Sequence, residues 1–299
     1  MQKHPQHIFG LMRAPFLILT PACVLVGLGT ALWTKSHVNG WHFVLVLLGA
    51  LAAHVSVNAF NEYFDFKTGL DAQTQRTPFS GGSGTLPEHP ELARTALVLA
   101  WLSFAMTALI GLYFVLVQGW QLLPLGLAGL FLLYGYTAWL VYHPVACLLA
   151  PGLGFGPLMV MGTHFALTGE YSWTAFAASL VPFFLVSNLL LLNQFPDVEA
   201  DRTIGRRHLP IVMGRGTSSL IYGAFLMLTY LAIGVGVGLG VLPVASLLGF
   251  VSLPLAMLAF SGAYRHAENL EKLVPSMGLN VLTTILTPVL VALGLLIGG

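Results

Sequence analysis

The sequence contains very little charge, because only 8% of its 299 residues are Asp, Glu, Lys or Arg. A soluble domain of this size carries about 25% charged residues, so a water-soluble globule is excluded. Cysteine is also scarce: Cys23 and Cys147 are the only two, and each lies in apolar sequence. We therefore expect two buried free thiols, and neither a disulfide nor a metal centre built on cysteine.

Apolar residues are abundant instead and make up 57% of the chain. Apolar runs long enough to cross a hydrocarbon core of about 30 Å recur along its whole length, whereas the short alternating segments of a membrane β-barrel are absent. The predicted class is therefore all-α, a polytopic membrane protein that forms one domain over residues 1–299. Hydropathy and the positions of Gly, Pro and charge predict nine spans, at about 16–34, 41–63, 95–117, 120–140, 146–167, 173–195, 218–240, 244–264 and 277–297.

Nine spans place the two termini on opposite sides of the membrane, and the basic residues indicate which side is which. With the N-terminus inside, only Lys35 lies outside, as the positive-inside rule requires. The inner segments then hold Lys3, Arg13, Lys67, Arg76, Arg94, Arg202, Arg206, Arg207, Arg215, Arg265 and Lys272. We predict a multi-pass protein of the inner (cytoplasmic) membrane with a cytoplasmic N-terminus. The first apolar stretch lacks a small-residue cleavage site, so we expect it to be a retained span.

The acidic residues collect on the same predicted face, because Glu170 alone falls outside. Two inner connections are long, at about residues 64–94 and 196–217, and the outer turns are short and almost uncharged. Binding groups concentrate in long ordered loops. We therefore expect the chemistry at the cytoplasmic ends of the helices.

The first acidic motif lies at the end of the second predicted span. It contains Asn58, Asn61, Glu62 and Asp65, whose spacing brings Asn58, Asn61 and Asp65 to one side of a helix. A glycine follows and should end the helix, so that Asp71 turns back toward the motif.

The second motif lies at the end of the sixth predicted span. Asn193, Asp197 and Asp201 follow an i, i+4, i+8 spacing, which places all three on one face if the helix continues through the intervening proline. Asn61-x₃-Asp65 and Asn193-x₃-Asp197 repeat the same pattern 132 residues apart. Two half-bundles could thus direct their polar ends toward one cavity.

Carboxylate and amide oxygens, with no His or Cys at ligand spacing, describe a site for a hard cation such as Mg²⁺. Basic side chains follow each motif: Lys67 and Arg76 after the first, and Arg206, Arg207 and His208 after the second. Carboxylates for Mg²⁺ beside cations for oxyanions suit a diphosphate. The alternative for either motif alone is a set of solvated charges at a helix end. Acidic groups at the edge of the hydrocarbon are costly unless they are paired or functional, so the two motifs together favour a site.

At these residues the sequence resembles the UbiA superfamily of intramembrane prenyltransferases. The similarity to its first motif lies in Asn61-Glu-Tyr-Phe-Asp65-Phe-Lys-Thr-Gly69-Leu-Asp71, and to its second in Asp197-x₃-Asp201 followed by Gly205-Arg-Arg-His-Leu-Pro. The features that resemble the 1,4-dihydroxy-2-naphthoate branch are Gly69-x-Asp71, Arg13-Ala-Pro, Tyr134-Gly-Tyr136-Thr137 and Gly156-Pro-Leu-Met-Val-Met-Gly162-Thr. The departures are Glu62 in place of the usual Asp, the less basic segment 76–84, and the lack of an Arg-containing pattern after Tyr136.

The resemblance implies a UbiA-like bundle of nine transmembrane helices with a central cavity that faces the cytoplasm. It implies Mg²⁺-dependent transfer of a prenyl group from a prenyl diphosphate to an aromatic acceptor, in lipid-quinone (menaquinone-type) biosynthesis. The metal ligands would be Asn61, Glu62, Asp65, Asp71, Asn193, Asp197 and Asp201. The diphosphate would contact Asn58, Lys67, Arg76, Arg206, Arg207 and His208. The catalytic residues would be Asp65, Asp197, Asp201 and Tyr136, with Tyr136 beside the carbocation or the diphosphate.

Several alternatives stay open. The acceptor could be 4-hydroxybenzoate, another aromatic compound or a lipid alcohol. An ion-coupled transporter would carry its carboxylates near the bilayer midplane, whereas these lie at one face, and a membrane scaffold leaves both motifs unexplained. His54, inside the second span, is interpreted as a hydrogen-bonded interior histidine, with an acid–base group as the alternative. The expected partners are the two substrates and the bilayer, with no nucleic acid and no obligate protein partner.

Overall fold

The computed structural model describes residues 5–74 and 76–298, and every regular element in that part of the chain is helical. Nine of its helical segments are long and apolar enough to cross a membrane, which confirms the predicted all-α polytopic class. The predicted inner position of Lys3 lies outside the described residues. The spans run Ala14–Lys35, Gly40–Thr68, Pro90–Gln118, Trp120–Ala138, Pro144–Thr168, Trp173–Thr203, Leu209–Gly238, Val244–Arg265 and Leu270–Ile297.

The spans consist of long helices with short helical pieces at their ends. The long helices are α2 (Leu19–Lys35), α3 (Gly40–Thr68), α5 (Ala93–Gln118), α6 (Leu123–Ala138), α9 (Trp173–Thr203), α10 (Leu209–Gly238), α11 (Leu253–Arg265) and α12 (Leu270–Ile297). The fifth span is composite and joins α7 (Pro144–Leu153), the π-helical segment η6 (Gly154–Met161) and α8 (Gly162–Thr168). The remaining pieces are α1 (Pro5–Leu11), η1 (Ala14–Ile18), η2 (Leu70–Ala72), α4 (Thr85–Glu88), η3 (Pro90–Leu92), η4 (Trp120–Leu122), η5 (Leu140–Tyr142) and η7 (Val244–Ser252).

Local capping fixes the ends of the two helices that carry the acidic motifs. The Asn39 side-chain oxygen accepts a hydrogen bond from the Trp41 backbone N–H at 2.9 Å at the start of α3. The Ser172 hydroxyl accepts one from the Ala175 N–H at 3.0 Å at the start of α9. These caps satisfy backbone donors that have no partner within the helix. As predicted, α3 ends at Gly69, whose φ of 73° is a left-handed conformation that glycine adopts without strain.

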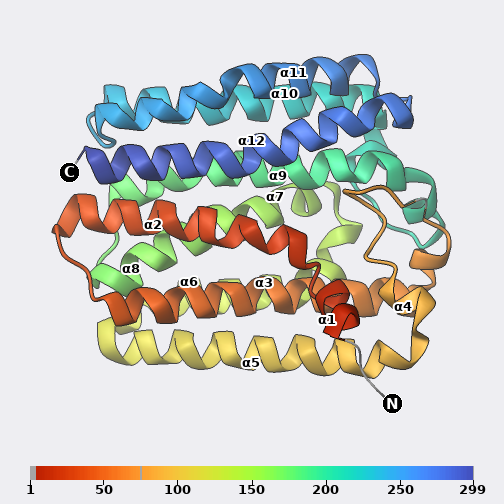
Figure 1. Cartoon of the computed structure of the whole chain (residues 1–299), viewed down its shortest axis with the longest axis horizontal. Coiled ribbons are helices and arrows are strands. Elements are labelled where there is room, and N and C mark those ends of the chain that lie inside the picture. Colours follow the sequence, from red (N-terminus) through yellow and green to blue (C-terminus); the bar gives the residue numbers. More distant parts are fainter. Residues whose placement is uncertain (1–4, 75, 299) are drawn as a thin grey trace.

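The helices run side by side along the long axis of the molecule, with α4 at one end of the bundle and the last turn of α12 at the other (Figure 1). Of the spans, α9 is the most buried, and it packs on α10, α12, α7 and α2. Hydrogen bonds cross these contacts: the Asn188 side-chain amide donates to the Tyr222 carbonyl at 2.8 Å, and the Tyr222 hydroxyl donates to Asn280 at 3.1 Å. The outermost spans, α5 and α6, carry exposed apolar side chains that suit contact with lipid.

The prediction of a long loop at 196–217 is wrong. The α9 helix continues through Pro196 to Thr203, and α10 begins at Leu209, so only residues 204–208 connect them. Charged residues favoured a loop, but a helix packed on its neighbours can tolerate an internal proline and extend beyond its apolar part. A break at Gly214 (φ 80°, ψ 159°) interrupts α10. The ninth span also begins earlier than predicted, at Leu270. The other long connection is present at residues 69–92.

Candidate active site

A polar pocket of about 110 Å³ lies where α3 and α9 meet the segment after Gly69. The motif residues on α3 that line it are Asn61 and Asp65, and those on α9 are Asn193, Asp197 and Asp201. Each set shares one helix face, because both helices continue through their motifs. The structure thus brings the two Asn-x₃-Asp repeats together in one pocket.

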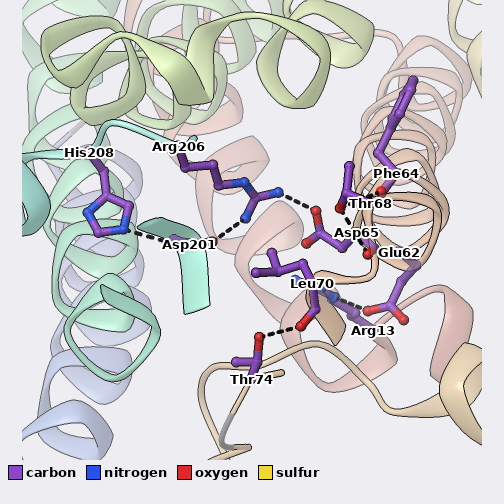
Figure 2. A network of polar contacts seen from close by, with 10 residues as sticks. All are labelled: Arg13, Glu62, Phe64, Asp65, Thr68, Leu70, Thr74, Asp201, Arg206 and His208. Carbon is purple, nitrogen blue, oxygen red and sulfur yellow. Dashed lines mark hydrogen bonds and ion pairs between the residues drawn. The ribbon is translucent and has the colours of Figure 1, made fainter. Parts of the chain in front are cut away.

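Arg206 joins the two motif helices (Figure 2). Its Nη1 atom lies 3.0 Å from Asp201 Oδ1, and its Nη2 atom forms a short ion pair with Asp65. All three side chains are almost entirely buried. Burial opposes the charge on Arg206, but Asp65 and Asp201 outweigh it and raise the pKa of the guanidinium above its ordinary value. Arg206 is therefore a permanent cation between the two acidic motifs.

His208 supports the same carboxylate from its other side. Its Nε2 atom lies 3.0 Å from Asp201 Oδ2, and the imidazole is 2% exposed. Both oxygens of Asp201 are therefore engaged, one by Arg206 and one by His208. This contact places His208 at the wall of the polar pocket, where it orients Asp201.

Glu62 has a different environment from the other motif carboxylates. It is fully buried, and its Oε1 atom lies 2.6 Å from Arg13 Nε (Figure 2). The Ser83 backbone N–H donates to the same oxygen at 2.9 Å, and the Ser83 hydroxyl donates to Oε2 at 2.6 Å. Glu62 does not line the polar pocket, whereas Arg13 does. Glu62 thus ties Arg13 and the glycine-rich segment 81–84 to α3.

Asp71, in η2, lines the pocket beneath that glycine-rich segment. A Cβ atom at Gly82 would lie 2.9 Å from Asp71 Oδ1, and Gly82 has a φ of 72°, so this close approach requires glycine. Burial, with the nearby carboxylates Asp65 and Glu62, raises the pKa of Asp71 to about 7. A cation in the pocket would favour the ionised form.

The donor set of the pocket fits a divalent cation. Four aspartates and two guanidinium groups line it, so the excess is two negative charges when all four carboxyl groups are ionised. Three oxygens of these side chains are fully buried and have no hydrogen-bond partner among the described residues: Asp71 Oδ2, Asn193 Oδ1 and Asp197 Oδ1. A buried acceptor without a partner costs about 1–3 kcal/mol, which a hard cation bound by these oxygens would offset. Among the described residues, no three His, Cys, Asp or Glu side chains already lie close enough together to hold one metal ion. Arg206 lies between Asp65 and Asp201.

Four of the six predicted diphosphate contacts lie outside the polar pocket: Asn58, which lines the neighbouring apolar cavity, and three cations. Lys67 is exposed, with Nζ 6.0 Å from the centre of the Tyr63 ring. Arg76 pairs with exposed Glu88 at 3.2 Å. Arg207 is exposed as well. The structure therefore does not bring these three cations to the motif carboxylates.

An apolar cavity of about 440 Å³ adjoins the polar pocket and shares part of its wall. Asn58 lies on its wall, where its amide donates to the Met12 carbonyl at 2.9 Å. The residues that line both spaces are Arg13, Asn61, Phe79, Tyr136, Leu190 and Asn193. Tyr136 therefore lies at the junction between a charged pocket and an apolar one. This pairing suits a substrate with an anionic head and a hydrocarbon tail.

Arg13 is the charged residue of the polar pocket that sequence reasoning did not place in the site. It lines both spaces and forms the ion pair with Glu62. The signal available was its position directly before the first span, in the Arg13-Ala-Pro segment. Its partner lies 49 residues further along the chain, so the contact itself has no local signature.

Comparison with known proteins adds independent information. The UbiA prenyltransferase family matches residues 21–282. A 1,4-dihydroxy-2-naphthoate octaprenyltransferase from Bacillus subtilis (strain 168) is 30% identical over 286 residues, which cover 93% of this chain and 89% of that protein.

Solved structures share the fold. A UbiA homolog from Aeropyrum pernix K1 superposes with a TM-score of 0.71 at 18% identity, over 94% of this chain and 97% of that one. A UbiA homolog from Archaeoglobus fulgidus bound to DMAPP and Mg²⁺ gives a TM-score of 0.57 at 14% identity, over 95% and 98%.

Proposed function

This chain belongs to the UbiA prenyltransferase family, and on that premise we propose that it transfers a prenyl group from a prenyl diphosphate to a naphthoate-type aromatic acceptor. The observation that carries the proposal is the junction of two spaces: a polar pocket with both acidic motifs and an apolar cavity. The product would belong to menaquinone-type quinone synthesis. The name of the Bacillus subtilis relative supports this acceptor class.

Mg²⁺ is the cofactor in this proposal, and the residues that would hold it are Asp65, Asp71, Asp197, Asp201, Asn61 and Asn193. When bound, the ion would neutralise the diphosphate and stabilise the charge that develops as the C–O bond breaks. Arg206 and Arg13 line the same pocket and would bind the remaining phosphate oxygens. We assign Glu62 to holding Arg13, because Glu62 does not line the polar pocket and its oxygens bond Arg13 and Ser83 instead.

The prenyl chain would lie in the apolar cavity, which excludes water from the allylic carbocation. Tyr136 lies at the junction, so its ring would face the developing cation and its π electrons would stabilise it. The acceptor ring carbon then attacks the carbocation. The ring loses a proton, or CO₂ where that carbon carries a carboxylate.

An acceptor panel tests the proposed function. Purified full-length protein with Mg²⁺ and geranyl diphosphate is expected to prenylate 1,4-dihydroxy-2-naphthoate in preference to 4-hydroxybenzoate, homogentisate and glycerol-phosphate lipids. Product masses identify the acceptor, and diphosphate release measures the rate. Prenylation of a glycerol-phosphate lipid alone would overturn the aromatic assignment and leave prenyl transfer intact. Transport of an ion without diphosphate release would favour the transporter alternative.

The proposed topology places the polar pocket on the cytoplasmic side of the inner membrane. The helix α4 and the connection between α2 and α3 lie at opposite ends of the bundle (Figure 1). Glu88 in α4 and His37 in that connection are exposed, so both are suited to labelling. In right-side-out vesicles, an impermeant maleimide is expected to label His37→Cys, and to label Glu88→Cys only after permeabilisation. Cys23 and Cys147 are buried, so their background labelling should be low. The reverse labelling pattern would refute the orientation.

The same proposal treats residues 1–299 as a single domain. The family match over residues 21–282 supports this organisation. The substrates and the bilayer are the partners that the proposed reaction requires.

A further inference from the structure

His54 is a polar side chain set into the wall of the apolar cavity. On α3 it belongs to the same face as Asn58, Asn61 and Asp65, because spacings of four, three and four residues return to one side of a helix. At a helical rise of 1.5 Å per residue, His54 lies roughly 10 Å along the axis from Asn61. It is therefore inside the cavity, beyond the junction with the polar pocket.

Only one ring nitrogen of His54 has a protein partner. Nδ1 lies 2.8 Å from the Thr20 hydroxyl, whereas Nε2 has no hydrogen-bond partner among the described residues. His54 is 6% exposed. Nε2 is not among the fully buried polar atoms that lack a partner, so it keeps some exposed surface, and the cavity is the space that His54 lines. A polar atom that faces an apolar space is costly unless a ligand supplies its partner.

A second histidine–threonine pair shows what a purely internal arrangement looks like in this fold. His164 Nδ1 lies 3.0 Å from the Thr30 hydroxyl, and His164 is fully buried. Its Nε2 atom is fully buried without a hydrogen-bond partner among the described residues, and His164 does not line the cavity. The two pairs share their chemistry and differ in access to the cavity. His164 is therefore a matched control for His54.

The cavity wall beside His54 is aromatic. The Phe155 ring lies edge-to-face with the imidazole, with centroids 4.8 Å apart and an interplanar angle of 78°. Phe155 belongs to the π-helical segment η6 and also lines the cavity. π-Helical turns are rare and occur frequently at functional sites. A phenyl ring next to an available ring nitrogen forms a surface for a flat molecule that carries a polar substituent.

We infer that His54 is the residue that recognises the acceptor, through a hydrogen bond between Nε2 and a ring hydroxyl. The inference rests on the proposed function and specifies its acceptor site. If the Thr20 hydroxyl donates to Nδ1, Nε2 carries the ring proton and is a donor; if the hydroxyl accepts from Nδ1–H, Nε2 is an acceptor. A hydroxyl satisfies both states, because it can donate and accept. An acceptor ring that lies between His54 and Tyr136 would be held by its hydroxyl while its reactive carbon faces the junction.

The test compares His54→Asn with His54→Gln in purified full-length protein. Asparagine can keep a polar atom near Nδ1 and the Thr20 contact but loses Nε2, whereas glutamine extends an amide toward the Nε2 position. With geranyl diphosphate, His54→Asn is expected to raise the KM for 1,4-dihydroxy-2-naphthoate about tenfold. The KM for geranyl diphosphate should rise much less than that for the acceptor, because a prenyl chain in the same cavity makes no hydrogen bond to Nε2. His54→Gln should recover part of the loss.

His164→Asn is expected to leave both KM values unchanged. In wild type, a monohydroxy-2-naphthoate that lacks the recognised hydroxyl should bind weakly, and His54→Asn should not weaken it further. An unchanged acceptor KM in folded His54→Asn would overturn this inference alone, while a wild type that prenylates no aromatic acceptor would overturn the proposed function with it. Should His54→Asn fail to fold, Thr20→Val provides the test, and an unchanged acceptor KM in that variant would count against the inference.

Discussion

Asp197→Ala is expected to lower the rate of diphosphate release by about 10²–10³-fold or more at saturating Mg²⁺. Asp197 lines the polar pocket. Its Oδ1 atom is fully buried and has no hydrogen-bond partner among the described residues. Because that oxygen bonds no described residue, its removal should affect the binding of metal and diphosphate more than the fold. Diphosphate release and product formation by purified protein measure the effect.

The control for this prediction is Glu199→Ala. Glu199 lies two residues further along the same helix, is exposed, and pairs with Arg202 at 3.1 Å. Its loss should leave turnover unchanged, and both variants should insert and unfold as wild type does. Near-normal turnover by folded Asp197→Ala would refute the metal site.

Asp65→Ala should lose activity to a similar degree, for an additional reason. Asp65 supplies a pocket carboxylate and is also one of the two partners of Arg206. Without it, the guanidinium would pair with Asp201 alone, and the ion-pair link between α3 and α9 would be lost. The same assay applies, and turnover close to that of wild type would show that Asp65 is dispensable.

Glu62→Ala is expected to have the largest effect on stability. It removes the buried partner of Arg13 and the carboxylate oxygens that accept from the Ser83 backbone N–H and hydroxyl. Removal of one member of a buried ion pair costs about 3–5 kcal/mol, because the other charge stays buried without its partner. We expect the lower end of that range, since Asp65 and Asp71 also attract Arg13. Thermal unfolding in detergent measures the loss.

Glu88→Ala is the matched control for that change. Glu88 and Arg76 form an ion pair in the same connection, but both side chains are largely exposed. Exposed pairs contribute about 0–1 kcal/mol, so the midpoint of unfolding should barely move. Equal midpoints for Glu62→Ala and wild type would show that the Arg13–Glu62 pair does not hold the glycine-rich segment in place.

Much of the architecture could be predicted because it depends on local properties of the chain. Low charge and long apolar runs determine the membrane class, and nine runs give nine spans. The helix-ending role of Gly69 also follows from its own conformational freedom. The extent of α9 beyond Pro196 could not be predicted in this way, because packing against neighbouring helices stabilises that stretch.

The sequence by itself determined that two acidic motifs exist and that each occupies one face of a helix, because side-chain direction follows from helical periodicity. Only the tertiary structure decided which charges meet. Arg206 pairs with Asp65 across 141 residues, and Arg13 pairs with Glu62 across 49, whereas Lys67, Arg76 and Arg207 lie outside the pocket. Such pairs form when separate helices pack side by side, so no local pattern specifies them. The cavity beside His54 has the same origin, because it is the space left between helices from several parts of the chain.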